Sequence, residues 1–421
     1  MVEEREEPKL RFPGFADPWE QRKFGDVLET VTDYVAAGSF ADLAKNVEYR
    51  DKPDFAQLVR TMDLKNGFTS SQEVFVDENA FHYLYRVNLD KECIILPNIG
   101  NCGEVYFVRP EALPYQHNVL GPNAIYVRSE TNNNLFLSTL FQAKDFQTKL
   151  SLIVSPNGQT KFNKTELKQI ELVLPSSETE QNKIGGFFEM VDEVIILHQR
   201  KRDEVKALKN AMLQKMFPKD GETVPEIRFP GFTDPWEQRK LSDVAEVVGG
   251  GTPSTTNPEY WDGDINWYAP AEIGEQIYVD SSERKITKLG LEKSSAKILP
   301  AHKTVLFTSR AGIGNTAILR TPAATNQGFQ SMVLHDDINP YFVFSMTGMI
   351  KAKAERVASG STFAEISGKM LGNLEFMFPL KAEQDKIGDY FESLDNLITL
   401  HQRKCDELKE LKKGLLQQMF V

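Results

Sequence analysis

Residues 180–217 read EQNKIGGFFEMVDEVIILHQRKRDEVKALKNAMLQKMF, and residues 383–420 read EQDKIGDYFESLDNLITLHQRKCDELKELKKGLLQQMF. Aligned without a gap, 23 of the 38 positions are identical. No proline interrupts either stretch, and both are rich in residues that favour helices, such as leucine, lysine and glutamate. The chain therefore uses one long helix-forming stretch twice, and an internal repeat of this kind decides the architecture before any local pattern does.

Apolar residues recur in both stretches at alternating steps of four and three. This heptad spacing predicts two long helices that pack as a coiled coil. His198 and His401 also fall on the seam, where a polar residue commonly fixes register, and we prefer that interpretation to catalysis. Ser177 and Glu180 have the spacing of a capping box at the start of the first helix. The apolar seam residues are Ile184, Phe188, Val191, Ile195 and Val205 in the first helix, and Ile387, Phe391, Leu394, Ile398, Cys405 and Leu408 in the second.

A second repeat shows how the helices are used. Residues 11–24 read RFPGFADPWEQRKF, and residues 228–241 read RFPGFTDPWEQRKL. Each short motif precedes a globular segment and then a long helix, so the chain reads as a circle cut at one of two equivalent junctions. We expect the motif's aromatic residues to pack the globular segment onto the helix junction. The predicted molecule has pseudo-two-fold symmetry, with two globular domains separated by two antiparallel helices and with its termini close together. The predicted boundaries are 1–177, 178–217, 218–380 and 381–421.

Composition favours a soluble cytoplasmic protein. The chain has 421 residues, enough for two or three domains that each bury a core. No apolar run approaches the roughly 20 residues that span a bilayer, and the acidic start MVEEREEPK does not resemble a signal peptide. The three cysteines form no CxxC pair, which argues against a zinc site or a disulfide framework.

Charge argues both for and against a nucleic-acid partner. The net charge of −11 opposes one. Residues 283–310, however, hold seven basic residues against Glu283 and Glu292. A local basic stripe of this kind can follow phosphates even on an acidic protein, although a solvated face is the simpler interpretation.

Both globular segments are predicted to be α/β, with mixed or antiparallel strands and few helices. In the first we expect strands at 74–76, 93–96, 104–108, 124–127, 152–155 and 170–174, and one helix over 134–150. In the second we expect strands at 265–268 and 304–308 and a helix over 339–354, with Asn339 as its N-cap and Pro340 at its first position. The loop 309–315 is expected to match 98–101. Asn326-Gln327 is expected to match residues 116–118.

No pattern indicates an enzyme or a cofactor site in this chain. Gly249 to Gly251 lacks the lysine of a phosphate-binding loop, and Gly312-Ile313-Gly314 lacks the third glycine of a dinucleotide site, so both are interpreted as turns. Ile338-Asn339-Pro340-Tyr341 resembles a methyltransferase motif but lacks its second proline, and no loop for S-adenosylmethionine precedes it. The six histidines have no metal-ligand spacing.

Taken together, the chain resembles the specificity subunits of type I restriction-modification enzymes over essentially its whole length. The resemblance rests on the two helices that begin with Glu-Gln-x-Lys-Ile-Gly and on the repeated Phe-Pro-Gly-Phe-x-x-Pro-Trp-Glu. It rests also on Gly-Gly-Thr-Pro-Ser at 250–254, followed by Tyr260-Trp261 and by Gly-Asp-Ile-Asn-Trp at 263–267.

The resemblance implies a non-catalytic subunit that recognises a bipartite target in double-stranded DNA. Each globular domain is then a target-recognition domain for one half of the site. The helices are spacers that dock two methyltransferase subunits, which bind S-adenosylmethionine and methylate adenine. Two restriction subunits that use ATP and magnesium join the larger complex. A 38-residue helix rises roughly 57 Å, more than one turn of DNA, so changing its length by about four residues should change the gap between half-sites.

Candidate DNA contacts are polar and basic residues in loops between strands, because such side chains reach base edges and phosphates. No motif of the family assigns them individually. They are Arg60, Lys65, Asn98, Asn101, Gln116 and Asn118 in the first domain, and Thr252, Ser254, Arg284, Lys285, Lys288, Arg310, Asn315, Asn326 and Gln327 in the second.

Candidate partner contacts lie on the repeated helices, where the sequence HQRK recurs without an evident packing reason. They are Gln199, Arg200, Lys201, Gln402, Arg403 and Lys404. Two other functions stay open at this point: a coiled-coil scaffold with paired protein-binding domains, and an enzyme with an unrecognised site. The scaffold predicts no salt-dependent affinity for DNA, and the enzyme predicts activity without partners.

Overall fold

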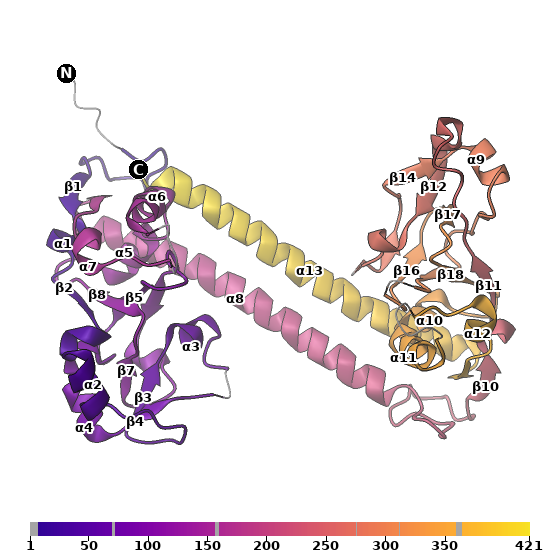
Figure 1. Cartoon of the computed structure of the whole chain (residues 1–421), viewed down its shortest axis with the longest axis horizontal. Coiled ribbons are helices and arrows are strands. Elements are labelled where there is room, and N and C mark those ends of the chain that lie inside the picture. The colour runs from indigo at the N-terminus through magenta and orange to yellow at the C-terminus, as the bar shows by residue number, and fades with distance from the viewer. Residues whose placement is uncertain (1–6, 70–71, 156–159, 275, 311, 359–363) are drawn as a thin grey trace. The chain divides into compact units, whose positions relative to one another are not determined.

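The computed structural model describes residues 7–69, 72–155, 160–274, 276–310, 312–358 and 364–421. The chain divides into two compact units (Figure 1). Unit 1 is Met1–His198 with Lys404–Val421, and unit 2 is Gln199–Arg403. The two long helices are α8, Glu178–Lys215, and α13, Lys381–Met419. Each unit therefore combines one globular domain with a segment of both helices.

Unit 1 contains two sheets and a separate strand pair. The larger sheet has the strand order β2-β8-β5-β6, the smaller sheet has the order β4-β3-β7, and β1 pairs with β9. The strands are β1 (Glu20–Lys23), β2 (Thr30–Asp33), β3 (Ala56–Val59), β4 (Phe75–Val76), β5 (Cys93–Pro97), β6 (Tyr106–Val108), β7 (Asn118–Leu120), β8 (Ala124–Arg128) and β9 (Glu171–Leu174). The short helices are α1 (Phe24–Val27), α2 (Phe40–Asn46), α3 (Thr61–Lys65), α4 (Glu78–Tyr83), α5 (Asn134–Leu140), α6 (Lys144–Ile153) and α7 (Lys164–Leu167).

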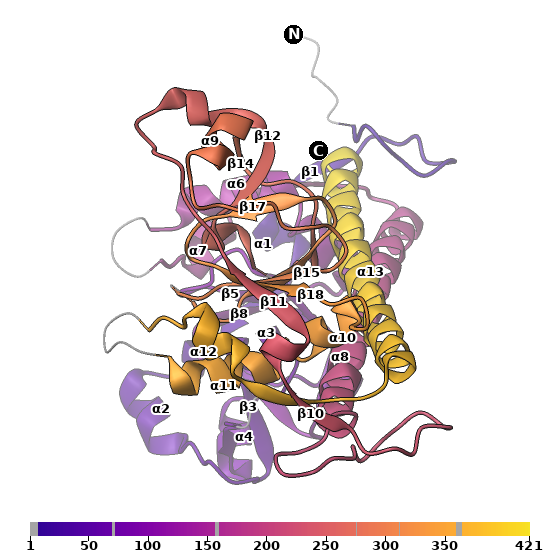
Figure 2. The ribbon, with the colours of Figure 1, turned by 90° about the vertical axis from the view of Figure 1, so that its right-hand side faces the viewer.

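Unit 2 repeats this plan. Its larger sheet has the order β11-β18-β15-β16-β13, its smaller sheet the order β14-β12-β17, and β10 pairs with β19. The strands are β10 (Glu237–Lys240), β11 (Ala245–Gly249), β12 (Trp261–Tyr268), β13 (Tyr278–Val279), β14 (Arg284–Ile286), β15 (Thr304–Phe307), β16 (Thr316–Leu319), β17 (Ala323–Thr325), β18 (Gln330–Leu334) and β19 (Glu375–Phe378). The helices are α9 (Lys288–Glu292), α10 (Pro340–Ser345), α11 (Thr347–Val357) and α12 (Gly368–Gly372). Figure 2 shows α9, β12 and β14 at one end of the unit, away from α11 and α12.

Strand pairing confirms that the two domains share a topology. In each small sheet the central strand runs parallel to one neighbour and antiparallel to the other: β3 with β7 and β4, and β12 with β17 and β14. The outer pairs have the same register, since Glu20 lies opposite Leu174 and Glu237 lies opposite Phe378. The sequence EQRK forms the first strand of the domain in both units.

Each helix predicted before the long helices is divided in two. Residues 134–150 form α5 and α6, and residues 339–354 form α10 and α11. The interruption lets Phe141 stack on Phe146 at 4.6 Å and on Phe24 at 5.2 Å, all inside the core. The strand expected at 152–155 is wrong, because α6 continues through Ile153. The predicted N-cap is confirmed, since the Asn339 side chain accepts from the Phe342 amide at 2.9 Å.

The first helical repeat is fixed to the first short motif by a buried ion pair. Arg11 of the motif donates two hydrogen bonds to the carboxylate of Glu180, at 2.6 and 2.8 Å, and this bonding raises the pKa of Arg11. Glu180 is 1% exposed. Only half of the predicted capping box forms, because Ser177 accepts from the Glu180 amide while the Glu180 carboxylate binds Arg11 instead.

The next residues of the repeat hold the start of α5. Gln181 accepts from the Asn133 amide at 2.9 Å and donates to the Pro175 carbonyl at 2.8 Å. Lys183 lies 5.0 Å from the centre of the Phe15 ring. A side chain at Gly185 would place its Cβ 2.9 Å from the Phe136 amide, so glycine is required where α5 meets α8. We call this set of contacts around Arg11 and Glu180 the clamp of unit 1.

Unit 2 has the same clamp. Arg228 donates to Glu383 at 2.7 and 2.8 Å, and Gln384 accepts from the Asn339 amide and donates to the Pro379 carbonyl. Lys386 lies 5.4 Å from the Phe232 ring, and a Cβ at Gly388 would lie 2.6 Å from the Asn339 side chain. Ile184 and Ile387 are buried in the cores. Each residue of the shared Glu-Gln-x-Lys-Ile-Gly sequence, except the variable third one, therefore makes a structural contact.

An aromatic residue at the end of a long helix completes the core of each unit. Unit 1 uses the end of α13, and unit 2 uses the end of α8. Phe420, just beyond α13, packs on Trp19 and Phe136 in unit 1. Phe217, just beyond α8, packs on Trp236 and Phe342 in unit 2. Within each unit the helix segments run antiparallel: Asp192 bonds Lys412 in unit 1, and Lys209 bonds Asp395 in unit 2. The predicted seam residues are buried or half-buried.

Candidate nucleic-acid interface

Three loops of unit 2 meet where the two sheets adjoin. The Gly251 amide donates to the Thr325 carbonyl at 2.8 Å, which ties the glycine-rich loop after β11 to the end of β17. The Ser309 amide donates to the Gly328 carbonyl at 2.8 Å, which adds the loop after β15. Thr252 also donates its hydroxyl to the side chain of Gln327. Sequence-predicted residues from three separate segments are thus brought together.

Close approaches to other backbone segments require glycine at two positions of the glycine-rich loop, Gly250 and Gly251. A Cβ at Gly250 would lie 2.0 Å from the Asn326 carbonyl oxygen, and one at Gly251 would lie 2.5 Å from the Ala296 amide. The glycines allow backbones to approach closely. This agrees with interpreting the run as a tight loop rather than as a phosphate-binding one.

Unit 1 joins the equivalent loops in the same way. The Asn98 amide donates to the Asn123 carbonyl at 3.1 Å, as Ser309 does to Gly328. The expected match of loop 98–101 with the loop that starts at residue 309 is therefore confirmed. The expected match of Asn326-Gln327 with residues 116–118 is wrong. Asn326 follows β17 and donates its amide to Tyr268, and its equivalent after β7 is Gly121, which donates to Val59.

The candidates of unit 1 differ in how far they are available to a ligand. The Arg60 guanidinium is bound by Asp63 at 2.8 Å, and Lys65 pairs with Glu104 at 2.6 Å. Asn98 is half-buried beside the Phe162 carbonyl, while Asn101 and Gln116 are exposed. Asn118 is only 4% exposed and donates to the Tyr115 carbonyl, so the structure places this candidate inside the domain.

The loop candidates of unit 2 are more accessible. Thr252, Ser254 and Gln327 are exposed, and Arg310 is half-buried. Asn315 and Asn326 are half-buried and hold backbone groups, the first by donating to the Ile273 carbonyl and the second by accepting from the Gly328 amide.

The basic run 283–310 does not form one stripe. Arg284 and Lys285 are neighbours on β14, and successive side chains on a strand point to opposite faces. Arg284 lies opposite Trp267 in the register, whereas Lys285 lies opposite Asn266. Lys288 begins α9 and is exposed. Arg284 stands on the ring of Trp261, with its guanidinium carbon 3.6 Å from the ring centre.

An apolar hollow at the equivalent loops of unit 1 was not predicted from the sequence. It has a volume of 630 Å³ and is lined by residues that include Tyr34, Phe40, Tyr49, Ile99 and Pro122. The Phe40 side chain is 82% exposed. The sequence gives little indication of this hollow, because a phenylalanine such as Phe40 at the start of a short helix is normally interpreted as a core residue.

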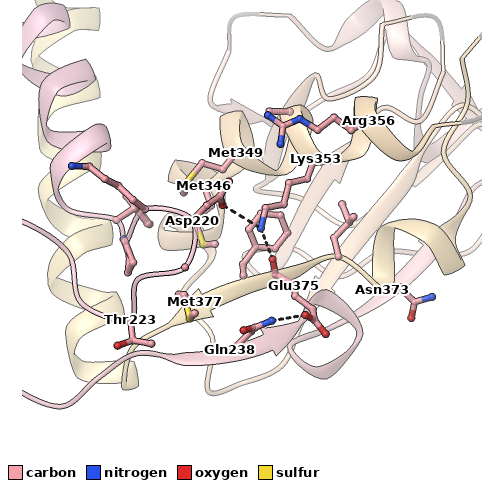
Figure 3. A pocket seen from close by; sticks show the side chains of 17 residues that line it. Asp220, Thr223, Gln238, Met346, Met349, Lys353, Arg356, Asn373, Glu375 and Met377 are labelled. Atoms are coloured by element: carbon pink, nitrogen blue, oxygen red, sulfur yellow. Dashed lines mark hydrogen bonds and ion pairs between the residues drawn. The ribbon is translucent and has the colours of Figure 1, made fainter.

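A second hollow, of 580 Å³, lies in unit 2, where residues 217–223 pass α11 and β19 (Figure 3). Lys353 points between Asp220 and the Glu375 carbonyl, to which it donates at 2.9 Å. Met346, Met349 and Met377 form part of its wall. This hollow holds paired charges and structural contacts rather than a nucleophile with its base. Among the described residues, no cluster of acidic, histidine or cysteine side chains could hold a metal ion.

The repeated helices expose matching leucines. Leu197 of α8 is 46% exposed and its equivalent Leu400 of α13 is 43% exposed; Leu208 and its equivalent Leu411 are 42% and 54% exposed. Single exposed leucines are common, but repetition at equivalent positions calls for a shared cause. The predicted partner contacts lie nearby: Arg200, Lys201, Arg403 and Lys404 are exposed, and Gln199 and Gln402 are half-buried. No described helix is long and apolar enough to cross a membrane.

The comparisons agree with this architecture. The model of the type I restriction modification DNA specificity domain matches residues 16–207 and 233–410. The MjaIX specificity subunit of Methanocaldococcus jannaschii is 35% identical over 190 residues, which cover 44% of this chain and 44% of that protein. The EcoR124I/EcoR124II specificity subunit of Escherichia coli is 31% identical over 172 residues, covering 39% and 42%. The chain thus spans less than half the length of these two relatives.

Matches that cover nearly the whole chain have lower sequence identity. The putative MjaX specificity subunit of M. jannaschii is 21% identical over 421 residues, covering 96% of this chain and 93% of that protein. The crystal structure of a type I restriction-modification S subunit from M. genitalium has a TM-score of 0.63 at 14% identity and covers 99% of both chains, which shows a shared fold. Since the family model matches both repeats, this chain belongs to the family of type I restriction modification DNA specificity proteins.

Proposed function

We propose that this chain recognises a bipartite target in double-stranded DNA, with each unit reading one half, and that it docks methyltransferase subunits on its long helices. The observation that carries the proposal is the contrast inside each unit. The clamp repeats contact for contact, whereas the loops and the small sheet carry different side chains. A protein that presents two different reading surfaces on one repeated frame suits a target with two different halves.

The chemistry of the exposed loop residues supports DNA as the ligand. Threonine, glutamine, asparagine and arginine side chains hydrogen-bond to base edges, and lysine contacts phosphate. In unit 2 we propose Thr252, Ser254, Arg284, Lys285, Lys288, Arg310 and Gln327 as contacts, with Asn315 and Asn326 shaping the loops. In unit 1 we propose Asn98, Asn101 and Gln116, with Lys65 after release from Glu104. Arg60 and Asn118 are proposed to support the domain rather than to touch DNA.

The exposed leucines and the HQRK segments support two equivalent docking sites. Each unit presents one leucine from α8 and one from α13: Leu197 and Leu411 in unit 1, Leu208 and Leu400 in unit 2. Equivalent sites suit two copies of one partner. The methyltransferase partners, rather than this chain, are proposed to bind S-adenosylmethionine. Two restriction subunits that use ATP and magnesium are proposed to join them, in the cytoplasm.

The test is selection from a randomised duplex library by the purified chain in complex with a methyltransferase subunit from the same source. The expected result is enrichment of two short fixed sequences separated by an unread gap, with affinity that falls steeply as salt rises. A complex that forms but enriches no sequence would favour the protein-binding scaffold instead. Methyl transfer to DNA by this chain alone would indicate an enzyme.

A further inference from the structure

A bulge in β12 brings two tryptophans to one basic residue of unit 2. Trp261 and Ile265 both lie opposite Ile286, so residues 262–264 are extra on their strand. Asp262 has a positive φ of 60°, and a Cβ at Gly263 would lie 2.6 Å from the Ile286 carbonyl oxygen. Bulges re-aim side chains and are frequent beside functional sites. Here the bulge brings Trp261 over Arg284, which already lies opposite Trp267.

The loop between β11 and β12 fixes both indole rings. Trp267 donates its ring nitrogen to the Gly251 carbonyl at 2.8 Å, and Trp261 donates to the Ser254 carbonyl at 3.1 Å. The rings meet edge to face at 5.1 Å and both are buried. The face of Trp261 therefore has one fixed orientation, set by the same loop that carries Thr252.

Arg284 is held by aromatic rings rather than by a carboxylate. Its guanidinium carbon lies 3.6 Å from the centre of the Trp261 ring and 5.9 Å from that of Trp267, yet the residue stays exposed. In the described part of the chain no carboxylate lies within 4 Å of it to form an ion pair. By contrast, Arg228, Arg239 and Arg320 pair with Glu383, Asp337 and Asp280 at 2.7, 3.3 and 3.9 Å, respectively.

The arginine guanidinium is planar, and its contact with the fixed Trp261 ring limits the positions that its N–H groups can take. This planar fork matches the two acceptors, O6 and N7, that guanine presents in the major groove. A phosphate can also accept two hydrogen bonds from a guanidinium, but phosphate binding does not require the guanidinium plane to be fixed. The neighbouring Lys288 is exposed and can contact phosphate instead.

We infer that Trp261 positions Arg284 to read one guanine in the half-site of unit 2. The inference rests on the proposed DNA-binding function and makes it specific. Arg284 is the residue that touches the base, and Trp261 acts through it as a positioning residue. The small sheet of unit 1 has no such device, because the position equivalent to Arg284 is Val74, whose carbonyl accepts from the Leu58 amide.

The experiment compares four variants of the full chain in the methyltransferase complex: Arg284→Ala, Arg284→Lys, Trp261→Phe and the matched control Arg320→Ala. Arg320 also stands on an aromatic ring, Tyr278, at 4.0 Å, but it lies beside Asp280. Each complex selects from the randomised library, and the motifs are compared base by base. Arg284→Ala is expected to lower the preference for one guanine about ten- to hundredfold and to leave the other half-site unchanged.

The other variants separate a base contact from a structural role. Arg284→Lys should bind with similar salt dependence yet lose the same preference, since lysine lacks the fork. Trp261→Phe should weaken the preference at that base only, and Arg320→Ala should leave the motif intact. A half-site of unit 2 without guanine, an unchanged motif for Arg284→Ala, or a uniform loss of affinity without relaxation at one base would overturn the inference. A wild-type complex that selects no sequence would instead overturn the proposed function itself.

Discussion

The clamps of the two units and their small sheets have diverged to very different degrees. Around the clamps, the arginine–glutamate hydrogen bonds measure 2.6 and 2.8 Å in unit 1 and 2.7 and 2.8 Å in unit 2. In the small sheets, strand order and direction are kept, but Arg284 stands on two tryptophans in unit 2 where unit 1 has Val74 beside Leu58. The same backbone thus carries different chemistry.

The difference between clamps and small sheets reflects two separate structural requirements. The clamp must join a domain to a helix start, and both junctions solve that problem with the same residues. The small sheet and its loops have no such shared demand, so their side chains are free to suit different ligands. We therefore expect substitutions in the clamps to have matching effects on both units, and substitutions in the small sheets to affect one unit alone.

The largest effect should come from Glu180→Ala and Glu383→Ala. Each variant leaves a largely buried arginine without its carboxylate, which costs about 3–5 kcal/mol in comparable pairs. Hydrogen exchange followed on peptides of each unit should show local loss of protection in the mutated unit first. The exposed Glu193→Ala on α8 is the control. Losses that differ by several kcal/mol between the two variants would break the equivalence of the clamps.

A smaller effect should distinguish the two helix ion pairs. Asp395 has 9% of its side chain exposed and also accepts from Tyr341, whereas the equivalent Asp192 has 42% exposed. Lys209→Ala therefore leaves a buried carboxylate and should cost about 3 kcal/mol, while Lys412→Ala should cost about 1 kcal/mol or less. Denaturant unfolding of the two variants checks this order, and the reverse order would contradict the burial argument.

Partner docking should be sensitive to the matching leucines. Leu197→Asp and Leu400→Asp alter exposed positions and should leave the fold intact, but each should weaken one methyltransferase site about tenfold or more. Native mass spectrometry at limiting partner concentration should show the complex change from two partners to one. Leu152→Asp, at an 80% exposed leucine of α6, is the matched control. Full occupancy in both variants would exclude these leucines from the interface.

Effects of opposite sign should come from two neighbouring glycines of α8. A Cβ at Gly186 would meet no atom within 4 Å, so Gly186→Ala should stabilise the helix by about 0.5–1 kcal/mol. Gly185→Ala should destabilise by about 1–3 kcal/mol, because its Cβ would press on the backbone of α5. Melting temperatures of the two variants should shift in opposite directions. A shift of the same sign would show that the α5 contact does not constrain Gly185.

Periodic features were predictable from the sequence. The seam residues of both helices follow from heptad spacing, and the duplicated frame follows from two repeats that can be aligned by eye. The Asn339 cap follows from local residue types next to Pro340. The reason for the repeated glycine at Gly185 was not predictable, since it depends on α5, whose contact with α8 arises only in the folded domain.

Features that depend on strand pairing were harder to predict. Asn118 appeared to be a loop residue, but it begins β7 and is buried against Tyr115. Arg284 and Lys285 appeared to be one basic patch, but strand geometry directs them to opposite faces. The contact of Arg284 with Trp261 depends on the bulge in β12, and no local sequence pattern predicts how β12 and β14 pair around that bulge. Reading surfaces built from long-range pairs therefore need the structure, whereas the frame does not.

Split-site recognition can be tested by single-molecule methylome sequencing of a methylation-free host that expresses this chain with its methyltransferase subunit. If each unit reads one half of the target, a methyladenine motif with two different halves separated by a gap should appear, and only when both proteins are present. A continuous motif, or a motif that appears with the methyltransferase subunit alone, would contradict the claim that two units of this chain each read half of the target.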